Sequence, residues 1–152
     1  MTEHLAEQQG VHGVLMIELF DTSGAALSVR WVNNLVTRGG KELLAQLLTG
    51  KGPLTQWTLA VGSGLDMPQA GDLMLQNRIA SVDTKPAVEV KDGAVRAIVR
   101  ATLTAPDKER SLSEAGIEIT LDGNTTLFNR VAFDVINQAP NVTLTLTWEI
   151  SF

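Results

Sequence analysis

The amino-acid sequence predicts a mainly β fold, an antiparallel β-sandwich or flattened barrel with one short helix near residues 38–48. Three observations predict it. Apolar and polar residues alternate over several short stretches, turn-forming pairs recur between these stretches, and helical spacing of apolar residues occurs in one place. Many short strands without a regular strand–helix alternation favour antiparallel sheets over a parallel βαβ fold.

The first predicted elements are a β-hairpin and the helix. Residues 14–20 are mostly apolar, the tetrad 21–24 is rich in turn formers, and apolar residues return at period two over 27–31. Leucines then recur at helical spacing within 38–48, after a candidate N-cap at Thr37 and before a glycine at position 50, where a helix would end.

The middle of the chain predicts a strand, a long loop and three further strands. Residues 57–61 alternate as a short strand that runs into an irregular segment extending to Gly71. Asp72 is placed to cap a single helical turn through 73–76. Strand patterns follow at 78–83, 87–91 and 95–103, and the pair Asp92-Gly93 between the last two is a strong signal for a two-residue hairpin turn.

The last forty residues predict three consecutive strands that form a meander. The strands cover 115–121, 126–136 and 143–152, and Asp122-Gly123 turns the chain between the first two. In the closing strand one face carries only apolar side chains, so we expect this face to lie in the core. Its members are Leu144, Leu146, Trp148, Ile150 and Phe152.

Length and composition bound the function. A chain of 152 residues fits a single domain, which we divide into an amino-terminal arm, 1–12, and a β-sandwich domain, 13–152. Cysteine is absent, so disulfides and thiol chemistry are excluded. The net charge of −5 opposes binding to nucleic acid. The polar amino terminus is unlike a signal peptide, and no apolar run has the length of a membrane span, so we expect a soluble protein without a membrane partner.

No pattern in the sequence predicts catalysis, a cofactor or a metal site. His4 and His12 are the only histidines, and their spacing matches no metal-binding motif. The segment Gly62-Ser63-Gly64 follows a strand, but it lacks the lysine and the long helix of a phosphate-binding loop. The acidic residues are too scattered for a calcium loop. We therefore predict a protein that is not an enzyme and has no small-molecule ligand.

One pair of charged residues predicts a structural contact. Glu114 and Arg130 lie on the two strands joined at Asp122-Gly123. Folding the hairpin there brings the two positions to about the same height on adjacent strands, so we expect a cross-strand ion pair. We assign this pair to stability rather than to catalysis.

The order of several short motifs resembles small bacteriophage tail proteins, in particular tail-fibre attachment and baseplate-associated domains of phages and phage-derived injection machines. The resemblance covers nearly the whole chain from Val14 onward, and its value lies in the ordered combination of the motifs. They are Asn34-Leu35-Val36-Thr37-Arg38-Gly39-Gly40, Leu59-Ala60-Val61-Gly62-Ser63-Gly64, Ser113-Glu114-Ala115-Gly116-Ile117, Leu127-Phe128-Asn129-Arg130-Val131-Ala132-Phe133 and Leu144-Thr145-Leu146-Thr147-Trp148-Glu149-Ile150.

The resemblance implies a virion structural protein that holds other particle proteins, assembles as a homo-oligomer and is made in the bacterial host cytoplasm. The chain lacks the long repeat and tip of a full tail fibre, which favours an adaptor or attachment subunit, or alternatively a capsid decoration protein. A further alternative is a carbohydrate-binding β-sandwich, and a hydrolase ranks third. Candidate partner contacts come from the arm, from the loop after position 62 and from one tryptophan: Met1, His4, His12, Ser63, Leu65, Met67 and Trp57.

Overall fold

Two antiparallel β-sheets packed face to face form the protein. The computed structural model describes residues 10–152, so Met1 and His4 of the predicted arm lie outside the described residues. The first sheet contains β1 (His12–Phe20), β2 (Ala26–Asn33), β6 (Ala87–Lys91), β7 (Ala94–Leu103) and β10 (Thr143–Ser151). The second contains β3 (Leu35–Val36), β4 (Leu54–Gly62), β5 (Arg78–Thr84), β8 (Arg110–Leu121) and β9 (Asn124–Gln138).

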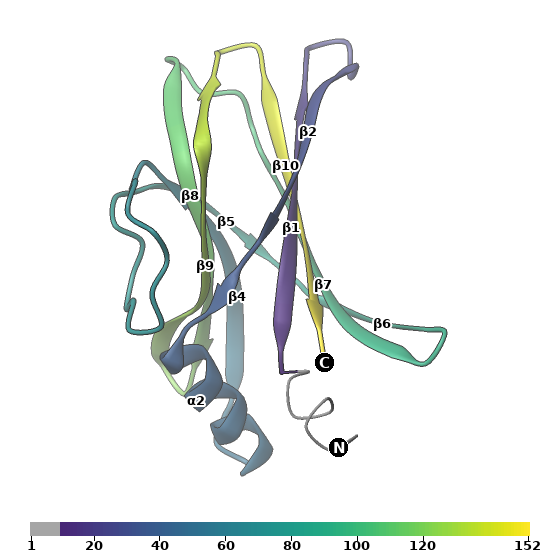
Figure 1. The fold of residues 1–152 in the computed structure, drawn as a ribbon, viewed down its shortest axis with the longest axis vertical. Helices are drawn as coiled ribbons and strands as arrows, with labels where there is room; N and C mark the ends of the chain where they lie inside the picture. Colours follow the sequence, from purple (N-terminus) through teal and green to yellow (C-terminus); the bar gives the residue numbers. More distant parts are fainter. Residues whose placement is uncertain (1–9) are drawn as a thin grey trace, which may run out of the picture.

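Each sheet has five strands, in the order β2-β1-β10-β7-β6 in the first and β3-β9-β8-β4-β5 in the second. A short helix, α2 (Arg38–Leu48), lies at one end of the sandwich (Figure 1). Apolar side chains from the facing sides of the two sheets form the main core. The predicted fold class, a mainly β antiparallel sandwich with a short helix, is therefore confirmed.

Both predicted two-residue hairpin turns are present. Asp92 and Gly93 have φ angles of 52° and 77°, and Asp122 and Gly123 have 51° and 80°. A left-handed conformation at both central positions is typical of the turn that matches the twist of the flanking strands, and Asp-Gly is a favoured pair for it. These turns set the register of β6 on β7 and of β8 on β9.

The predicted closing meander is wrong in its last step. β8 pairs with β9, but β10 leaves the second sheet and lies in the first, between β1 and β7. The alternation in β10 correctly predicted a half-buried strand, because Leu144, Leu146, Trp148 and Ile150 are all buried. Alternation shows which face of a strand is buried but not which strand lies beside it. Phe152, which we expected on the same buried face, follows the end of β10 and is exposed.

The apolar face of β2 that carries Trp31 is not a core face. Trp31 pairs with Met16 of β1, and its indole lies on the outer side of the first sheet, where it is exposed. The period-two pattern over 27–31 therefore marks the outer face of an edge strand rather than a core face.

Helix α2 begins at the predicted cap. Thr37 Oγ1 accepts a hydrogen bond from Gly40 N at 2.9 Å and donates one to the carbonyl of Leu127 at 2.6 Å. A Cβ atom at Gly40 would collide with the carbonyl of Phe128, so glycine lets the first turn of the helix lie directly against β9. The cap thus fixes the helix to the second sheet.

A chain of side-chain hydrogen bonds joins the two sheets. Trp148 Nε1 of β10 donates to Asn34 Oδ1, and Asn129 Nδ2 of β9 donates to the same oxygen at 3.3 Å. Asn129 Oδ1 in turn accepts from Ile117 N of β8 at 2.9 Å. The indole therefore has a partner inside the core, as a buried N–H requires.

Candidate functional site

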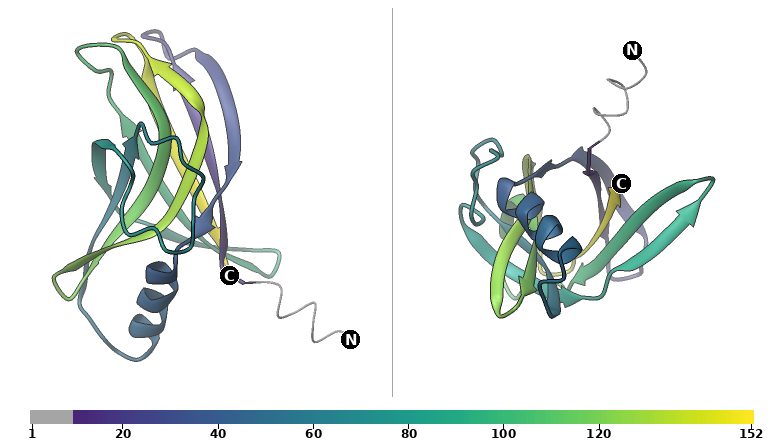
Figure 2. Two further views of the ribbon diagram at one scale, coloured as in Figure 1. Left: turned by 60° about the vertical axis from the view of Figure 1, so that its left-hand side comes forward. Right: turned by 90° about the horizontal axis from the view of Figure 1, so that it is seen from below.

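The most distinctive part of the surface is loop 63–77, which connects β4 to β5. The loop covers the outer face of the second sheet in front of β8 and β9 (Figure 2). Its Leu75 is buried and forms a small second core with Ala60 and Leu127. The second sheet is therefore covered on both faces, by the first sheet on one side and by this loop on the other.

Glu114 of β8 binds both ends of the loop. Its side chain is fully buried, and its two carboxylate oxygens accept from three main-chain N–H groups: Gly64 at 2.7 Å, Gln76 at 2.8 Å and Asn77 at 2.7 Å. The neighbouring Ser113 Oγ donates to the carbonyl of Gly64 at 2.7 Å. One side chain thus supplies the acceptors that a buried irregular backbone otherwise lacks.

Arg130 of β9 forms the expected ion pair with Glu114. Arg130 Nε donates to Glu114 Oε1 at 3.0 Å, and Nη1 lies 3.2 Å from Asp72 Oδ2 in the loop. The two residues are not directly opposite each other, although the sequence suggests that they are. Glu114 lies opposite Ala132 and Arg130 lies opposite Gly116, so the two positions are offset by two residues. The pair is therefore diagonal across the two strands, within reach of long side chains.

The electrostatics of the site favour an ionised Glu114. Burial raises the pKa of this carboxyl, but the hydrogen bonds from the Asn77 and Gln76 amides, from Arg130 and from the Gly64 amide outweigh it and hold the pKa below its ordinary value. Glu114 therefore carries its negative charge in the folded protein at neutral pH. A buried charge of this kind requires its donors to stay in place.

Side chains of the loop complete its internal hydrogen bonds. Gln76 Oε1 accepts from Leu65 N at 2.9 Å and from Asp66 N at 3.1 Å. Asp72 Oδ2 accepts from Gln69 N at 2.9 Å. The predicted helical turn over 73–76 is absent, because Asp72 binds an amide that precedes it in the chain and the following amides bind Glu114 instead.

Two glycines allow the close contact between the loop and its anchor. A Cβ atom at Gly62 would collide with the carbonyl of Asn77, and one at Gly64 would lie 2.7 Å from Gln76 Oε1 and even closer to the Glu114 carboxylate. The Gly62-Ser63-Gly64 motif therefore makes room for Glu114 and for the return of the loop. Ser63 Oγ accepts from Asn77 Nδ2 and closes the base of the loop.

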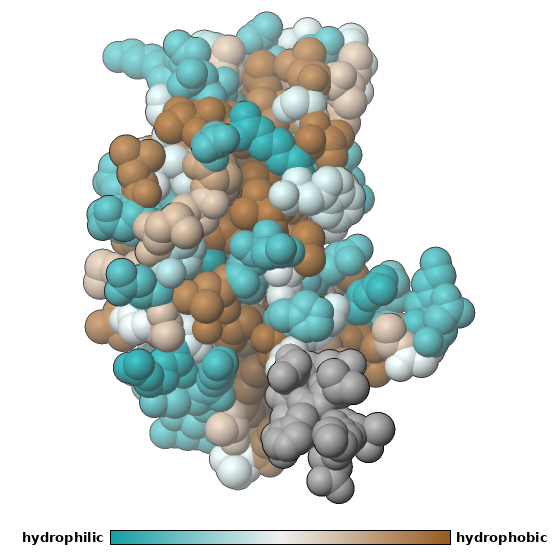
Figure 3. All heavy atoms as spheres, in the orientation of Figure 1, coloured by the Kyte–Doolittle hydropathy of each residue, from teal (hydrophilic) through white to brown (hydrophobic). Residues whose placement is uncertain are grey.

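The outer side of the loop presents a set of apolar side chains that we call the loop patch. All four are between 72% and 81% exposed: Leu65, Met67, Leu73 and Met74. Leu65 and Met67 also line a pocket of about 270 Å³ together with Phe133 and Val135 of β9. In the space-filling view, apolar surface appears over this part of the molecule, at the left of Figure 3.

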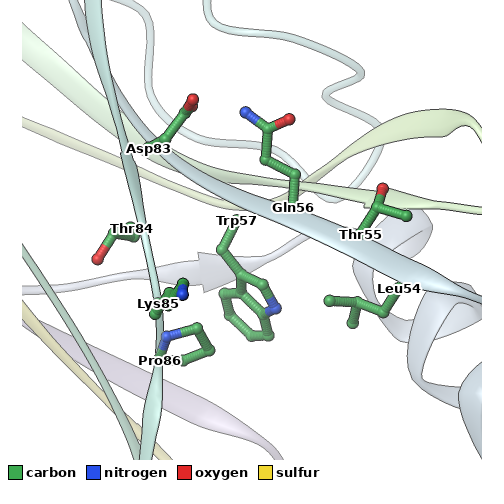
Figure 4. A pocket seen from close by; sticks show the side chains of 8 residues that line it. All are labelled: Leu54, Thr55, Gln56, Trp57, Asp83, Thr84, Lys85 and Pro86. Atoms are coloured by element: carbon green, nitrogen blue, oxygen red, sulfur yellow. The ribbon is translucent and has the colours of Figure 1, made fainter.

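Trp57 lies at a different place, beside an open cleft of about 580 Å³ between β4 and the segment that leaves β5. Its indole is half-buried, with the ring centroid 6.5 Å from that of Phe128. Gln56 and Asp83 of the cleft point away from the indole (Figure 4). These two polar side chains therefore do not flank the indole face as they would in a sugar site.

The predicted contact residues thus fall into separate groups. Leu65 and Met67 belong to the loop patch, Ser63 lies at the base of the same loop, and Trp57 lies in the cleft. His12 begins β1 and is exposed, with Nδ1 2.9 Å from the carbonyl of Gly10. Sequence analysis missed the amide-binding role of Glu114 and the exposed pair Leu73-Met74. The consecutive apolar residues 73–75 inside a loop were the available signal.

Within residues 10–152 there is no group of three or more His, Cys, Asp or Glu side chains that could hold a metal ion. The helix in this part of the chain is too short and too polar to cross a membrane. Comparison of the chain with protein-family models, with curated proteins and with solved structures gave no match. The function must therefore be argued from the geometry of the site and from the motif order in the sequence.

Proposed function

We propose that this protein is a non-enzymatic structural subunit of a bacteriophage tail, baseplate or tail-like particle, and that the loop patch contacts a neighbouring particle protein. A capsid decoration protein is the alternative within the same class, since it would use the same kind of surface. The motif order described above supports the phage assignment, and the loop patch supports the binding role.

The binding role rests on one observation: exposed apolar side chains lie on a backbone that is held in place. Large exposed apolar groups gathered on one surface are typical of protein–protein contacts. Leu73 and Met74 directly precede Leu75, which is buried, and Gln76, whose amide binds Glu114. The backbone that presents them is therefore ordered before any partner binds, which lowers the entropic cost of association.

The loop lacks regular structure, as predicted, and Leu75 and Glu114 tie it to the second sheet. We rank the carbohydrate-binding alternative lower, because the indole of Trp57 packs near Phe128, and Gln56 and Asp83 of its cleft point away from it.

The test compares a double and a single charged variant at highly exposed apolar sites. Leu73→Asp combined with Met74→Asp places charge on the loop patch, whereas Leu48→Asp places it at the end of α2, where Leu48 is also highly exposed. Particles are sedimented from cells that produce them, and the tagged subunit is located by immunoblot and by electron microscopy of the particle. Circular dichroism checks that each variant folds.

We expect the wild-type chain and Leu48→Asp to sediment with the particle and the double variant to remain in the supernatant with an unchanged melt. A wild-type chain that joins no particle, or a double variant that is incorporated normally, would show that the proposal is wrong. Turnover of a substrate by the purified chain would contradict the non-enzymatic role.

A further inference from the structure

Within residues 10–152, strand β2 forms a free edge of the first sheet and carries exposed apolar side chains on its outer face. Val29 pairs with Glu18 and Trp31 with Met16 on β1, so their side chains lie on the side of the sheet away from the core. Leu27 precedes them at the same spacing. The exposed fractions of the three side chains lie between 49% and 61%.

Along this edge, the backbone of β2 has hydrogen-bonding groups that no strand of the described part of the chain pairs with. Asn34 N donates to the carbonyl of Gly13, which fixes the alternation of the antiparallel ladder between β2 and β1. Residues two apart repeat the same direction, so the N–H and C=O groups of Arg30 and Val32 point toward β1. The corresponding groups of Val29 and Trp31 therefore point to the free edge.

The other edges are shorter or carry more charge than β2, whose own irregularity is the bulge at Leu27, between Ala26 and Ser28. β6 is short and carries Glu89 and Lys91, β5 carries Arg78 and Asp83, and β3 has two residues. Charges and short length are the usual protection of an edge strand. The one charged residue of β2, Arg30, turns toward the second sheet and donates to the carbonyl of Asp134 at 2.8 Å.

We infer that β2 pairs with β2 of a second copy of this chain, antiparallel about a two-fold axis at Val29. Trp31 of each copy then lies opposite Leu27 of the other, at the bulge between Ala26 and Ser28, so the apolar residues of both strands lie side by side on the outer face. The first sheet of one copy and the first sheet of the other then become one continuous sheet across the dimer.

Charge and apolar contact together favour an axis at Val29 over an axis at either neighbouring residue. An axis at Arg30 would place the two guanidinium groups directly opposite each other, and like charges in that position oppose pairing. An axis at Ser28 would place Trp31 opposite Ala25, which lies in the turn before β2. The axis at Val29 places Arg30 opposite the neutral Ser28, so no like charges meet.

The exposed apolar surface beside this edge is close to that of a small interface. A buried tryptophan contributes roughly 150 to 250 Å² of surface, and Trp31 is 61% exposed in the single chain. Leu27 and Val29 add to it, and the partly buried Met16 and Phe20 of β1 lie alongside. Together with the strand backbone, this surface approaches the ~500 Å² per copy that the smallest specific interfaces bury.

The test is the oligomeric state of the purified chain by sedimentation velocity across a concentration series. This inference does not depend on the proposed function, because it concerns isolated chains and a surface outside the loop patch. Val29→Pro removes an N–H that points to the free edge, so the single chain tolerates it while strand pairing is blocked. Val90→Pro is the matched control on the free edge of β6, where the turn after Lys91 places the N–H of Val90 outward.

We expect a dimer for the wild type and for Val90→Pro. For Val29→Pro we expect a dimer dissociation constant at least about 30-fold higher, because paired backbone hydrogen bonds and side-chain packing are lost together. Ser28→Glu should tighten the dimer and Ser28→Arg should weaken it, because this residue faces Arg30 of the other copy. Trp31→Gln, which changes no backbone group, should also weaken it.

A wild-type chain that stays monomeric at a concentration on the order of 100 μM would overturn the inference. A dimer that survives both Val29→Pro and Trp31→Gln would show that the interface lies elsewhere. A dimer that responds equally to Ser28→Glu and Ser28→Arg would overturn the register. Circular dichroism distinguishes these results from misfolding.

Discussion

The irregular loop 63–77 is attached to the core more firmly than the regular β6–β7 hairpin, the reverse of what their secondary structure suggests. The hairpin is regular, with an unbroken ladder from Ala87 opposite Ile98 to Lys91 opposite Ala94, yet every residue of β6 is exposed and the hairpin projects from the body (Figures 1 and 2). The loop has no regular structure, yet buried side chains hold it to the second sheet.

The comparison teaches that regular structure and attachment to the core have different physical origins. A hairpin satisfies its backbone by its own ladder, so it forms without burying side chains. An irregular loop on a sheet face needs acceptors from elsewhere for its amides, and Glu114 supplies them. The irregular segment is therefore the one that depends on a single buried residue.

The largest effect on this comparison is expected for Glu114→Ala. Removing the carboxylate leaves Arg130 and three main-chain amides without their acceptor, so we expect a loss of about 3 to 5 kcal/mol in the free energy of unfolding. Urea denaturation measures it. Glu118→Ala is the control on the same strand, because Glu118 pairs with the partly exposed Arg78, and its loss should cost at most about 1 kcal/mol.

The double variant Glu114→Ala with Arg130→Ala extends this test. If the two side chains act as one unit, the coupling energy of the mutant cycle exceeds about 1 kcal/mol. Additive effects would contradict the proposed dependence of the loop on this pair.

A second test separates the buried from the exposed leucine of the loop. Leu75→Ala should destabilise the protein by about 2 to 3 kcal/mol, at the low end for a buried leucine because its cluster is small. Leu73→Ala, two residues earlier and exposed, should change stability by less than about 0.5 kcal/mol. Equal effects in thermal melts would mean that the loop is not held by its packing.

A third test uses pH to discharge the anchor without removing it. The folded-state pKa of Glu114 lies below its ordinary value, so its contribution to stability is present above about pH 4.3, the unfolded pKa, and is lost as the pH falls through the folded pKa. Wild type should therefore lose stability in acid faster than Glu114→Gln does. Parallel pH profiles of the two proteins would show that this carboxylate does not titrate with folding.

The smallest effect is expected in the hairpin. Val90→Thr keeps a β-branched residue at an exposed position, so the free energy of unfolding should change by less than about 0.5 kcal/mol. Hydrogen exchange sharpens the comparison: the amides of Gly64, Gln76 and Asn77 should exchange slowly, and the outward amide of Val90 should exchange fast. The reverse order would contradict the contrast between the two regions.

Sequence predicted what depends on neighbours in the chain. The turns at Asp92-Gly93 and Asp122-Gly123 and the cap at Thr37 require only a few adjacent residues, and all three are present. The placement of β10 could not be predicted, because β9 and β1 both offer an edge and the alternation fits either one. Trp31 shows the same limit, since a period-two pattern does not say which face of a strand is covered.

The candidate site was predictable only in part for the same reason. The hairpin brought Glu114 toward Arg130, so the pair could be expected. The three amides that bind Glu114 come from two segments about 40 to 50 residues earlier in the chain, at separations of 50, 38 and 37 residues, and no local pattern relates them. The exposure of Leu73 beside the buried Leu75 likewise depends on how the loop lies on the sheet.

The central position of β10 in the first sheet has a consequence for the order of folding. β1 and β7 both pair with β10, and the first register pair joins His12 to Ser151. The first sheet therefore closes only after the two ends of the domain meet, whereas β8 and β9 of the second sheet are joined by a two-residue turn. Because distant pairings are slow to form, folding should proceed in milliseconds to seconds, with the second sheet as the early template. Until β10 arrives, β1 and β7 have unpaired edges toward each other, and this is the stage at which aggregation competes with folding.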